Sequence, residues 1–227
     1  MIAWPPDFDV DTQQLIEAVQ PFTMTSPERI SAFRDALRHV SRHNIPGAIV
    51  ECGVWKGGSM MAAAKTLLAL ADKRQLFLFD TFRGMTAPEA VDCDLSGHPA
   101  AHLLNSPTTS TLMRCESPLE EVQQNMASTG YDAHLVKYIV GPVEDTIPEH
   151  APEQIAVLRL DTDWYGSTVH ELRHLYPRLA IGGLLIIDDY GHWQGARKAV
   201  DEFLTETGTP LFLHRIDYTG RIGVKLC

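Results

Sequence analysis

The length, composition and charge of the chain already limit its function. Its 227 residues, 44% of them hydrophobic, are enough for one sizeable core, so we expect a single domain over residues 1–227. A formal net charge of −10 argues against nucleic acid and against a membrane surface as partners. The expected ligand is therefore a small molecule.

The start of the chain and its cysteines favour a cytoplasmic protein. The N-terminal stretch holds no basic segment followed by an apolar one, which argues against a signal peptide. No apolar stretch approaches the length of a membrane-spanning helix. The four cysteines show no close pairing, which fits reduced thiols; they are Cys52, Cys93, Cys115 and Cys227.

Residues 1–45 are expected to form an N-terminal helical cover segment. Prolines punctuate residues 1–25, and one short helix is predicted over residues 12–20. This first part is either a mobile cover over a binding site or an arm packed on the core. A second helix is predicted to begin at Ser26, because Ser is a favoured N-cap and Pro27 suits the first helical position.

A glycine-rich turn follows the first predicted strand, residues 48–52, and precedes a helix over residues 60–71. Such a turn lets backbone N–H groups approach a ligand closely. Its spacing from Gly53, Gly-x-x-x-Gly-Gly, differs from the pyrophosphate-binding pattern of dinucleotide enzymes. The second strand, residues 75–79, leads to Asp80, which is well placed to accept hydrogen bonds from ribose hydroxyls. Together the two features predict an adenosine-type cofactor.

Periodicity is lost over residues 81–117, which are rich in Pro, Ser, Thr, Asp and His. We interpret this long insertion as a loop on the substrate side. The later elements alternate and end in a hairpin, which predicts an α/β fold with a mostly parallel, doubly wound, seven-stranded sheet. They are helices over 118–129, 167–179 and 194–207, strands over 134–140, 155–160 and 183–187, a loop over 141–152, and hairpin strands over 211–216 and 221–226.

Two apolar runs of strand length each end in a pair of carboxylates. One run leads to Asp161 and Asp163, and the other leads to Asp188 and Asp189. Neighbouring parallel strands would bring these acids to one rim of the sheet, which indicates a site for a hard metal ion. The alternative is that the four residues are helix N-caps and exposed turn acids.

Two other patterns contain residues that bind zinc in other proteins. The motif H-E-x-x-H at residues 170–174 is the zinc-protease signature on a predicted helix. Both histidines fall opposite the apolar face of that helix, so we expect a solvated stripe instead. A second set matches no common zinc spacing and reflects loop composition; its members are Cys93, His98, His102 and Cys115.

The sequence resembles the class I S-adenosylmethionine-dependent methyltransferases, and within them the macrocin O-methyltransferase family, which methylates sugars of macrolides and related natural products. The resemblance covers nearly the whole chain. It rests on residues 21–29 (PFTMTSPER), 51–59 (ECGVWKGGS), 80–85 (DTFRGM), 161–168 (DTDWYGST) and 183–191 (GLLIIDDYG). It implies a Rossmann-like fold with S-adenosylmethionine and Mg²⁺ as cofactors and a glycosylated small molecule as the acceptor.

The resemblance also implies roles for particular residues. The S-adenosylmethionine pocket would be lined by Glu51, Gly53, Ser59 and Asp80, with Asp80 on the ribose. The Mg²⁺ ligands would be Asp161, Asp188 and Asp189, and the general base would be Asp163. His192, which follows the second acid pair, is a second candidate base, although a loop histidine is more often merely solvated.

Two rival functions remain open. Asp161-Thr162-Asp163 is also the D-x-D motif of a metal-dependent nucleotide-sugar glycosyltransferase. A catalytically silent binding protein on the same fold would use residues 81–117 for partner contacts. The glycine turn, the acid at the end of the second strand and the second acid pair favour the methyltransferase. The assembly that we expect is a homodimer or a higher homo-oligomer.

Overall fold

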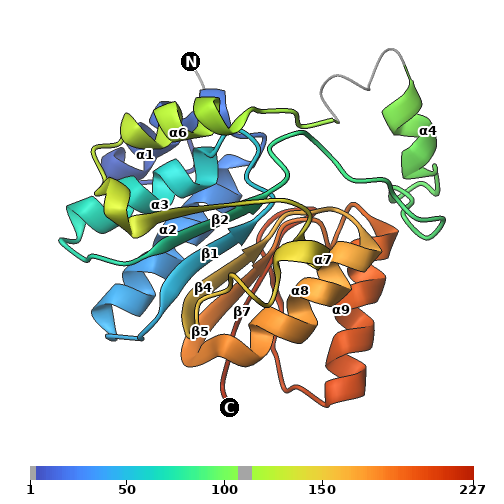
Figure 1. Cartoon of the computed structure of the whole chain (residues 1–227). Helices are drawn as coiled ribbons and strands as arrows, with labels where there is room; N and C mark the ends of the chain where they lie inside the picture. Colours follow the sequence, from blue (N-terminus) through green and yellow to red (C-terminus); the bar gives the residue numbers. More distant parts are fainter. Residues whose placement is uncertain (1–3, 107–113) are drawn as a thin grey trace.

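One seven-stranded sheet forms the centre of the molecule (Figure 1). The computed structural model describes residues 4–106 and 114–227, so parts of two predicted segments, residues 1–3 and 107–113, lie outside the described residues. In sheet order the strands are β3 (Val136–Val140), β2 (Leu76–Asp80), β1 (Ala48–Cys52), β4 (Ile155–Leu160), β5 (Leu179–Ile187), β7 (Arg221–Val224) and β6 (His214–Arg215).

The directions of the strands confirm the predicted sheet. The first five strands along the chain pair in parallel, and β7 pairs antiparallel with both β5 and β6. Parallel strands need crossover connections, which the intervening helices supply on both faces. The result is a doubly wound sheet that closes in an antiparallel hairpin.

Helices cover both faces of the sheet, so the molecule has three layers (Figure 1). One face carries α1 (Val10–Val19), α2 (Pro27–Arg42), α3 (Gly58–Ala69) and α6 (Leu119–Ala127). The other face carries α7 (Val143–Thr146), α8 (Tyr165–Leu175) and α9 (Gln194–Thr207). The remaining helical pieces are α4 (Ala100–Asn105) and the 3-10 turns η1 (Gln20–Phe22), η2 (Ala133–Leu135) and η3 (Tyr176–Arg178).

The start of α2 shows how local sequence fixes the N-terminal layer. The Ser26 side chain accepts a hydrogen bond from the Arg29 N–H at 3.2 Å, and Pro27 occupies the first helical position, as predicted. Burying one large apolar side chain contributes roughly 1.5–3 kcal/mol, so α2 is held mainly by its core-facing residues. These residues recur at helical spacing and are at most 1% exposed: Ile30, Phe33, Leu37 and Val40.

The N-terminal segment has two parts with different surroundings. α1 buries Ile16 and Val19 in the same apolar core as α2 and α3, so it is packed on the body of the protein. Thr23, Met24 and Thr25, which follow it, line the cavity described below. Of the two alternatives predicted for this segment, α1 matches the arm packed on the core. Residues 23–25 instead lie at the cavity.

Several predicted boundaries were wrong. The helix predicted over residues 167–179 ends at Leu175, because the next turn is the 3-10 turn η3, which contains Pro177. Strand β5 therefore begins at Leu179, earlier than predicted. The strand predicted over residues 211–216 is reduced to β6, and the predicted loops contain α4 and α7. No helix within residues 4–106 and 114–227 is long and apolar enough to cross a membrane.

Candidate active site

A cavity of about 530 Å³ lies at the carboxyl ends of the parallel strands. It adjoins the boundary between β1 and β4, where the strand order turns to opposite directions, and open α/β sheets bind ligands at such a point. Its volume is typical of small-molecule sites. Eight of the nine predicted site residues line it: Gly53, Ser59, Asp80, Asp161, Asp163, Asp188, Asp189 and His192.

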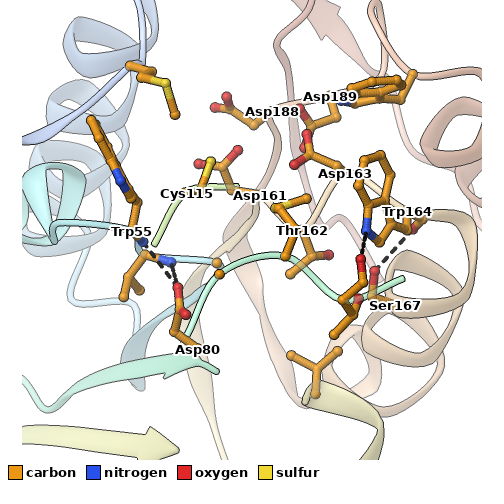
Figure 2. A pocket seen from close by; sticks show the side chains of 18 of the residues that line it. Trp55, Asp80, Cys115, Asp161, Thr162, Asp163, Trp164, Ser167, Asp188 and Asp189 are labelled. Carbon is orange, nitrogen blue, oxygen red and sulfur yellow. Dashed lines mark hydrogen bonds between the residues drawn. The ribbon is translucent and has the colours of Figure 1, made fainter. Parts of the chain in front are cut away.

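The strand register explains why the predicted metal ligands meet. Strands β1, β4 and β5 end side by side, and the residues after them continue the hydrogen-bond ladder. The Asp161 N–H donates to the Cys52 carbonyl at 2.9 Å, and the Asp188 N–H donates to the Leu160 carbonyl at 2.9 Å. Side-chain oxygens of Asp161, Asp188 and Asp189 lie within 4.8 Å of one another. Figure 2 shows these carboxylates gathered on one side of the cavity.

Asp163 and Asp189 form a second close pair of acids in the same corner (Figure 2). Burial raises the pKa of Asp163 to about 6, and burial together with the Asp163 charge raises the pKa of Asp189 well above its usual range. Among the described residues, no ion pair includes Asp189. Two carboxyl groups this close cannot both ionise unless a cation lies beside them, so this corner favours a cation.

Two arginines that sequence analysis did not select support the acid group. Arg29 of α2 forms an ion pair with Asp188, and its Nε lies 3.0 Å from Asp217 Oδ2. Arg159 of β4 pairs with Asp161 at 2.7 Å and with Asp188 at 2.5 Å. The two oxygens of Asp188 therefore accept from different guanidinium groups. The negative charge of the cluster is only partly balanced by these two cations.

Asp80 lies on the other side of the cavity, where it holds the glycine-rich turn (Figure 2). Its Oδ2 accepts hydrogen bonds from the Val54 N–H at 2.7 Å and the Trp55 N–H at 3.1 Å. Its Oδ1 accepts from the Phe82 N–H at 2.7 Å. Trp55 and Phe82 both have positive φ angles, of 46° and 52°. Asp80 therefore stabilises two residues in backbone conformations that residues other than glycine rarely adopt.

Gly53 is required where β1 turns toward α3. Its φ is +79°, and a Cβ at this position would lie 2.1 Å from the Asp161 carbonyl oxygen. We expect Gly53→Ala to displace Asp161 and to lower the free energy of unfolding, measured by urea denaturation. Gly130→Ala is the matched control, because Gly130 has φ +76° but no atom within 4 Å of its Cβ position. Gly53→Ala should cost about 1–3 kcal/mol more than the control; equal costs would contradict this role.

Glu51 is placed differently from its predicted position in the cofactor pocket. Its side chain is buried, and it is not among the described residues that line the cavity. Glu51 pairs with Arg159, its cross-strand neighbour in β4. Burial raises the pKa of Glu51 to about 8. Glu51 therefore lies behind the cavity wall and reaches the acid cluster only through Arg159.

Aromatic side chains form a wall beside the acids. The rings of Trp164 and Trp193 meet edge to face with centroids 5.0 Å apart, and Trp164 Nε1 donates to the Thr86 carbonyl at 3.0 Å. His192 Nδ1 lies 2.9 Å from the Tyr218 hydroxyl, and burial lowers the pKa of His192. All five residues line the cavity. The two tryptophans were not among the predicted site residues, although each lies within four residues of a predicted metal ligand.

The H-E-x-x-H motif lies on α8, outside the cavity wall. Its histidines are half-buried, so the expected solvated stripe was wrong, and His170 Nε2 lies 2.9 Å from the Ile147 carbonyl oxygen. Glu171 is fully buried and accepts a hydrogen bond from the Thr162 hydroxyl at 2.9 Å. Glu171 thus supports the loop that carries the acids.

The fold and the site define a Rossmann-like methyltransferase of class I. The structure is similar to that of the O-methyltransferase NovP, with a TM-score of 0.77 and 28% identity over 91% of this chain and 83% of NovP. The chain belongs to the macrocin-O-methyltransferase (TylF) family, which it matches over residues 11–222. It is therefore an O-methyltransferase, as predicted.

Two curated relatives are each about one-third identical to this chain. Mycinamicin III 3''-O-methyltransferase of Micromonospora griseorubida is 33% identical over 199 residues, which cover 87% of this chain and 76% of the relative. The 8-demethyl-8-(2,3-dimethoxy-alpha-L-rhamnosyl)-tetracenomycin-C 4'-O-methyltransferase of Streptomyces olivaceus is 34% identical over 205 residues, 87% and 73% of the two chains. Family membership favours the methyltransferase over the glycosyltransferase and the silent binding protein.

Proposed function

We propose that this chain transfers a methyl group from S-adenosylmethionine to a sugar hydroxyl of a glycosylated natural product and uses Mg²⁺ in doing so. The observation that carries the proposal is the group of four aspartates at one side of the cavity, opposite the turn held by Asp80. The acids suit a hard cation, and the turn suits an adenosine-type ligand. The same cavity could therefore bind the cation and the methyl donor next to each other.

The methyl donor would lie against the turn between β1 and α3. Gly53 lines the cavity at this turn, and Ser59 lies in the first turn of α3, where N–H groups favour an anionic group such as a carboxylate. Asp80 would accept hydrogen bonds from ribose hydroxyls in addition to its backbone bonds. S-adenosylmethionine, when bound, supplies a methyl group activated by the sulfonium.

The metal would be held by Asp161, Asp188 and Asp189. Their ligand atoms are carboxylate oxygens within 4.8 Å of one another, which is the donor type that Mg²⁺ prefers. A divalent cation held by these residues would lower the pKa of a neighbouring hydroxyl group of the acceptor.

We assign Asp163 as the general base for the acceptor hydroxyl. Its pKa is raised to about 6 by burial, so its carboxylate is a stronger base than an ordinary aspartate and is ionised near neutral pH. It lies beside Asp189 at the edge of the predicted metal site. His192 is the alternative base, because it also lines the cavity and burial favours its neutral form.

The acceptor class follows from the relatives and from the cavity wall. The Streptomyces olivaceus relative is named for 4'-O-methylation of a tetracenomycin that carries a rhamnosyl group, and the Micromonospora griseorubida relative is named for 3''-O-methylation of mycinamicin III. Here Trp164 and Trp193 are buried in the cavity wall, and Tyr218, which is 56% exposed, offers an amphipathic ring to a sugar or an apolar aglycone. The wall and the acids together support a sugar hydroxyl as the methylated group.

Calorimetric titration of the purified protein with S-adenosylmethionine tests the proposal. We expect saturable binding with one equivalent, and methylation of glycosylated acceptors that requires added Mg²⁺. A panel of nucleotide sugars is the control and should produce no binding heat. Binding of a nucleotide sugar in place of S-adenosylmethionine would overturn the proposed donor, and full methylation in the presence of a chelator would overturn the proposed metal.

A further inference from the structure

Arg159 occupies a position in the middle of the sheet where an apolar residue is usual. It is only 1% exposed and is the largest fully buried side chain among the described residues. Its chain neighbours, Leu158 and Leu160, pack in the core under α8 and α9, so Arg159 points to the opposite face. Burying a guanidinium costs several kcal/mol unless charged partners and hydrogen bonds compensate. The compensating groups indicate what this arginine does.

All four partners of Arg159 belong to the acid cluster or to its surroundings. Nη1 donates to Glu51 and to Asp161 Oδ2, the latter at 2.7 Å. Nη2 donates to Asp188 Oδ1 at 2.5 Å and to the Thr25 hydroxyl at 2.8 Å. Arg159 therefore bridges two of the three predicted metal ligands. Glu51 and Thr25 hold the same guanidinium from β1 and from the N-terminal segment.

The bridge is rigid because a guanidinium group is planar and its donors point in fixed directions. Asp161 and Asp188 directly follow two separate strands, β4 and β5, and their carboxylates would repel each other without a bridge. We propose that Arg159 is a positioning residue that sets the spacing of Asp161 and Asp188, so that their remaining lone pairs converge with Asp189 on one divalent cation. This inference rests on the proposed metal-dependent function.

If Arg159 positions the metal ligands, its removal has the opposite effect on cation affinity from the effect expected if it only balances charge. If Arg159 only added positive charge, its removal would make the site more negative and would tighten cation binding. If Arg159 sets the ligand spacing, its removal weakens cation binding although the site becomes more negative. Arg159→Lys separates the two further, because it keeps the charge and loses the planar fork.

The experiment is a titration of the full chain with Mn²⁺, in which the concentration of free Mn²⁺ is measured by electron paramagnetic resonance. We expect one Mn²⁺ site in the wild-type protein and an affinity that is about 10- to 100-fold weaker in Arg159→Lys and Arg159→Met, as for other groups that orient metal ligands. The affinity for S-adenosylmethionine should change less than the affinity for Mn²⁺, because Arg159 is not among the described residues that line the cavity.

Arg74→Lys is the matched control. Arg74 is also largely buried, pairs with Asp72 at 2.7 Å and donates to the Ile45 and Gly47 carbonyls, but it precedes β2, at the end of the strand away from the cavity. The control should bind Mn²⁺ as the wild-type protein does. Unchanged affinity in Arg159→Lys, or tighter binding in Arg159→Met, would overturn the inference.

Thr25→Val keeps the inference testable if neither Arg159 variant folds. This change removes one acceptor from Nη2 without altering charge, so we expect weaker Mn²⁺ binding, and unchanged affinity would count against positioning. The result for the wild-type protein distinguishes a failure of the proposed metal site from a failure of the role proposed for Arg159. A wild-type protein that binds no Mn²⁺ would refute the proposed metal, whereas wild-type binding with unaffected variants would refute the role of Arg159 alone.

Discussion

Asp189→Ala is expected to reduce turnover by about 10³-fold or more and to leave the protein folded. The change removes one of three converging carboxylates, and the loss of about 4 kcal/mol of transition-state stabilisation corresponds to this factor. Stability should fall by no more than about 1 kcal/mol, the usual contribution of one hydrogen bond, because the substitution removes the side-chain hydrogen bond between Asp189 and Asp163. Among the described residues no ion pair includes Asp189, so no buried cation loses its partner.

Methyl transfer, thermal unfolding and Mn²⁺ binding together check this prediction. Asp35→Ala provides the control, since Asp35 is an acid on α2 with a side chain that is 67% exposed, and its loss should leave all three measurements unchanged. If Asp189→Ala retained wild-type turnover, Asp189 would not be a metal ligand. If instead the variant unfolded, the hydrogen bond between Asp189 and Asp163 would be essential to the fold.

Asp163→Asn is expected to slow turnover by about 10²- to 10⁴-fold, the usual contribution of a general base. The substitution keeps the shape of the side chain and removes its ability to accept a proton. Asp163 has φ +67°, and asparagine tolerates this left-handed conformation as well as aspartate does. Binding of S-adenosylmethionine and Mn²⁺ should therefore remain close to wild type, which calorimetry and spectroscopy would measure.

His192→Gln is the comparison that decides between the two candidate bases. His192 contacts Tyr218 through Nδ1 and lines the same cavity, so its loss should affect acceptor binding more than turnover. A wild-type rate in Asp163→Asn with a large loss in His192→Gln would move the role of base to the histidine. Comparable losses in both variants would show that neither residue acts alone.

The strands and the rim acids could be predicted because their signals are local. Ala48–Cys52 and Ile155–Leu160 are apolar runs bounded by polar turns, and the structure gives both strands the predicted bounds. Since the carboxyl ends of neighbouring parallel strands share one edge, the acids that follow β4 and β5 had to meet once the strand order was known. The placement of Asp161 near Asp188 follows from that geometry.

The partners of the acids could not be predicted because they come from distant parts of the chain. Arg29 lies 159 positions before Asp188, and Glu51 lies 108 positions before Arg159. One local signal was available: Arg159 is the single charged residue between Ile155 and Leu160, a pattern that predicts a buried charge with a partner. The early start of β5 at Leu179 also escaped prediction, since Gly182 and Gly183 within it are unfavourable in strands.

An early and a late segment of the chain meet beside the acids, which affects when this corner can form during synthesis. Ser26 and the nearby Arg29 both contact Asp217, which lies between the last two strands, 191 positions after Ser26. A nascent chain therefore cannot complete this corner until nearly all of it has left the ribosome. Until β7 pairs with β5, the apolar β5 is an open edge to which other chains can add. A premature stop before Arg221 would thus give an aggregating product instead of a slow enzyme.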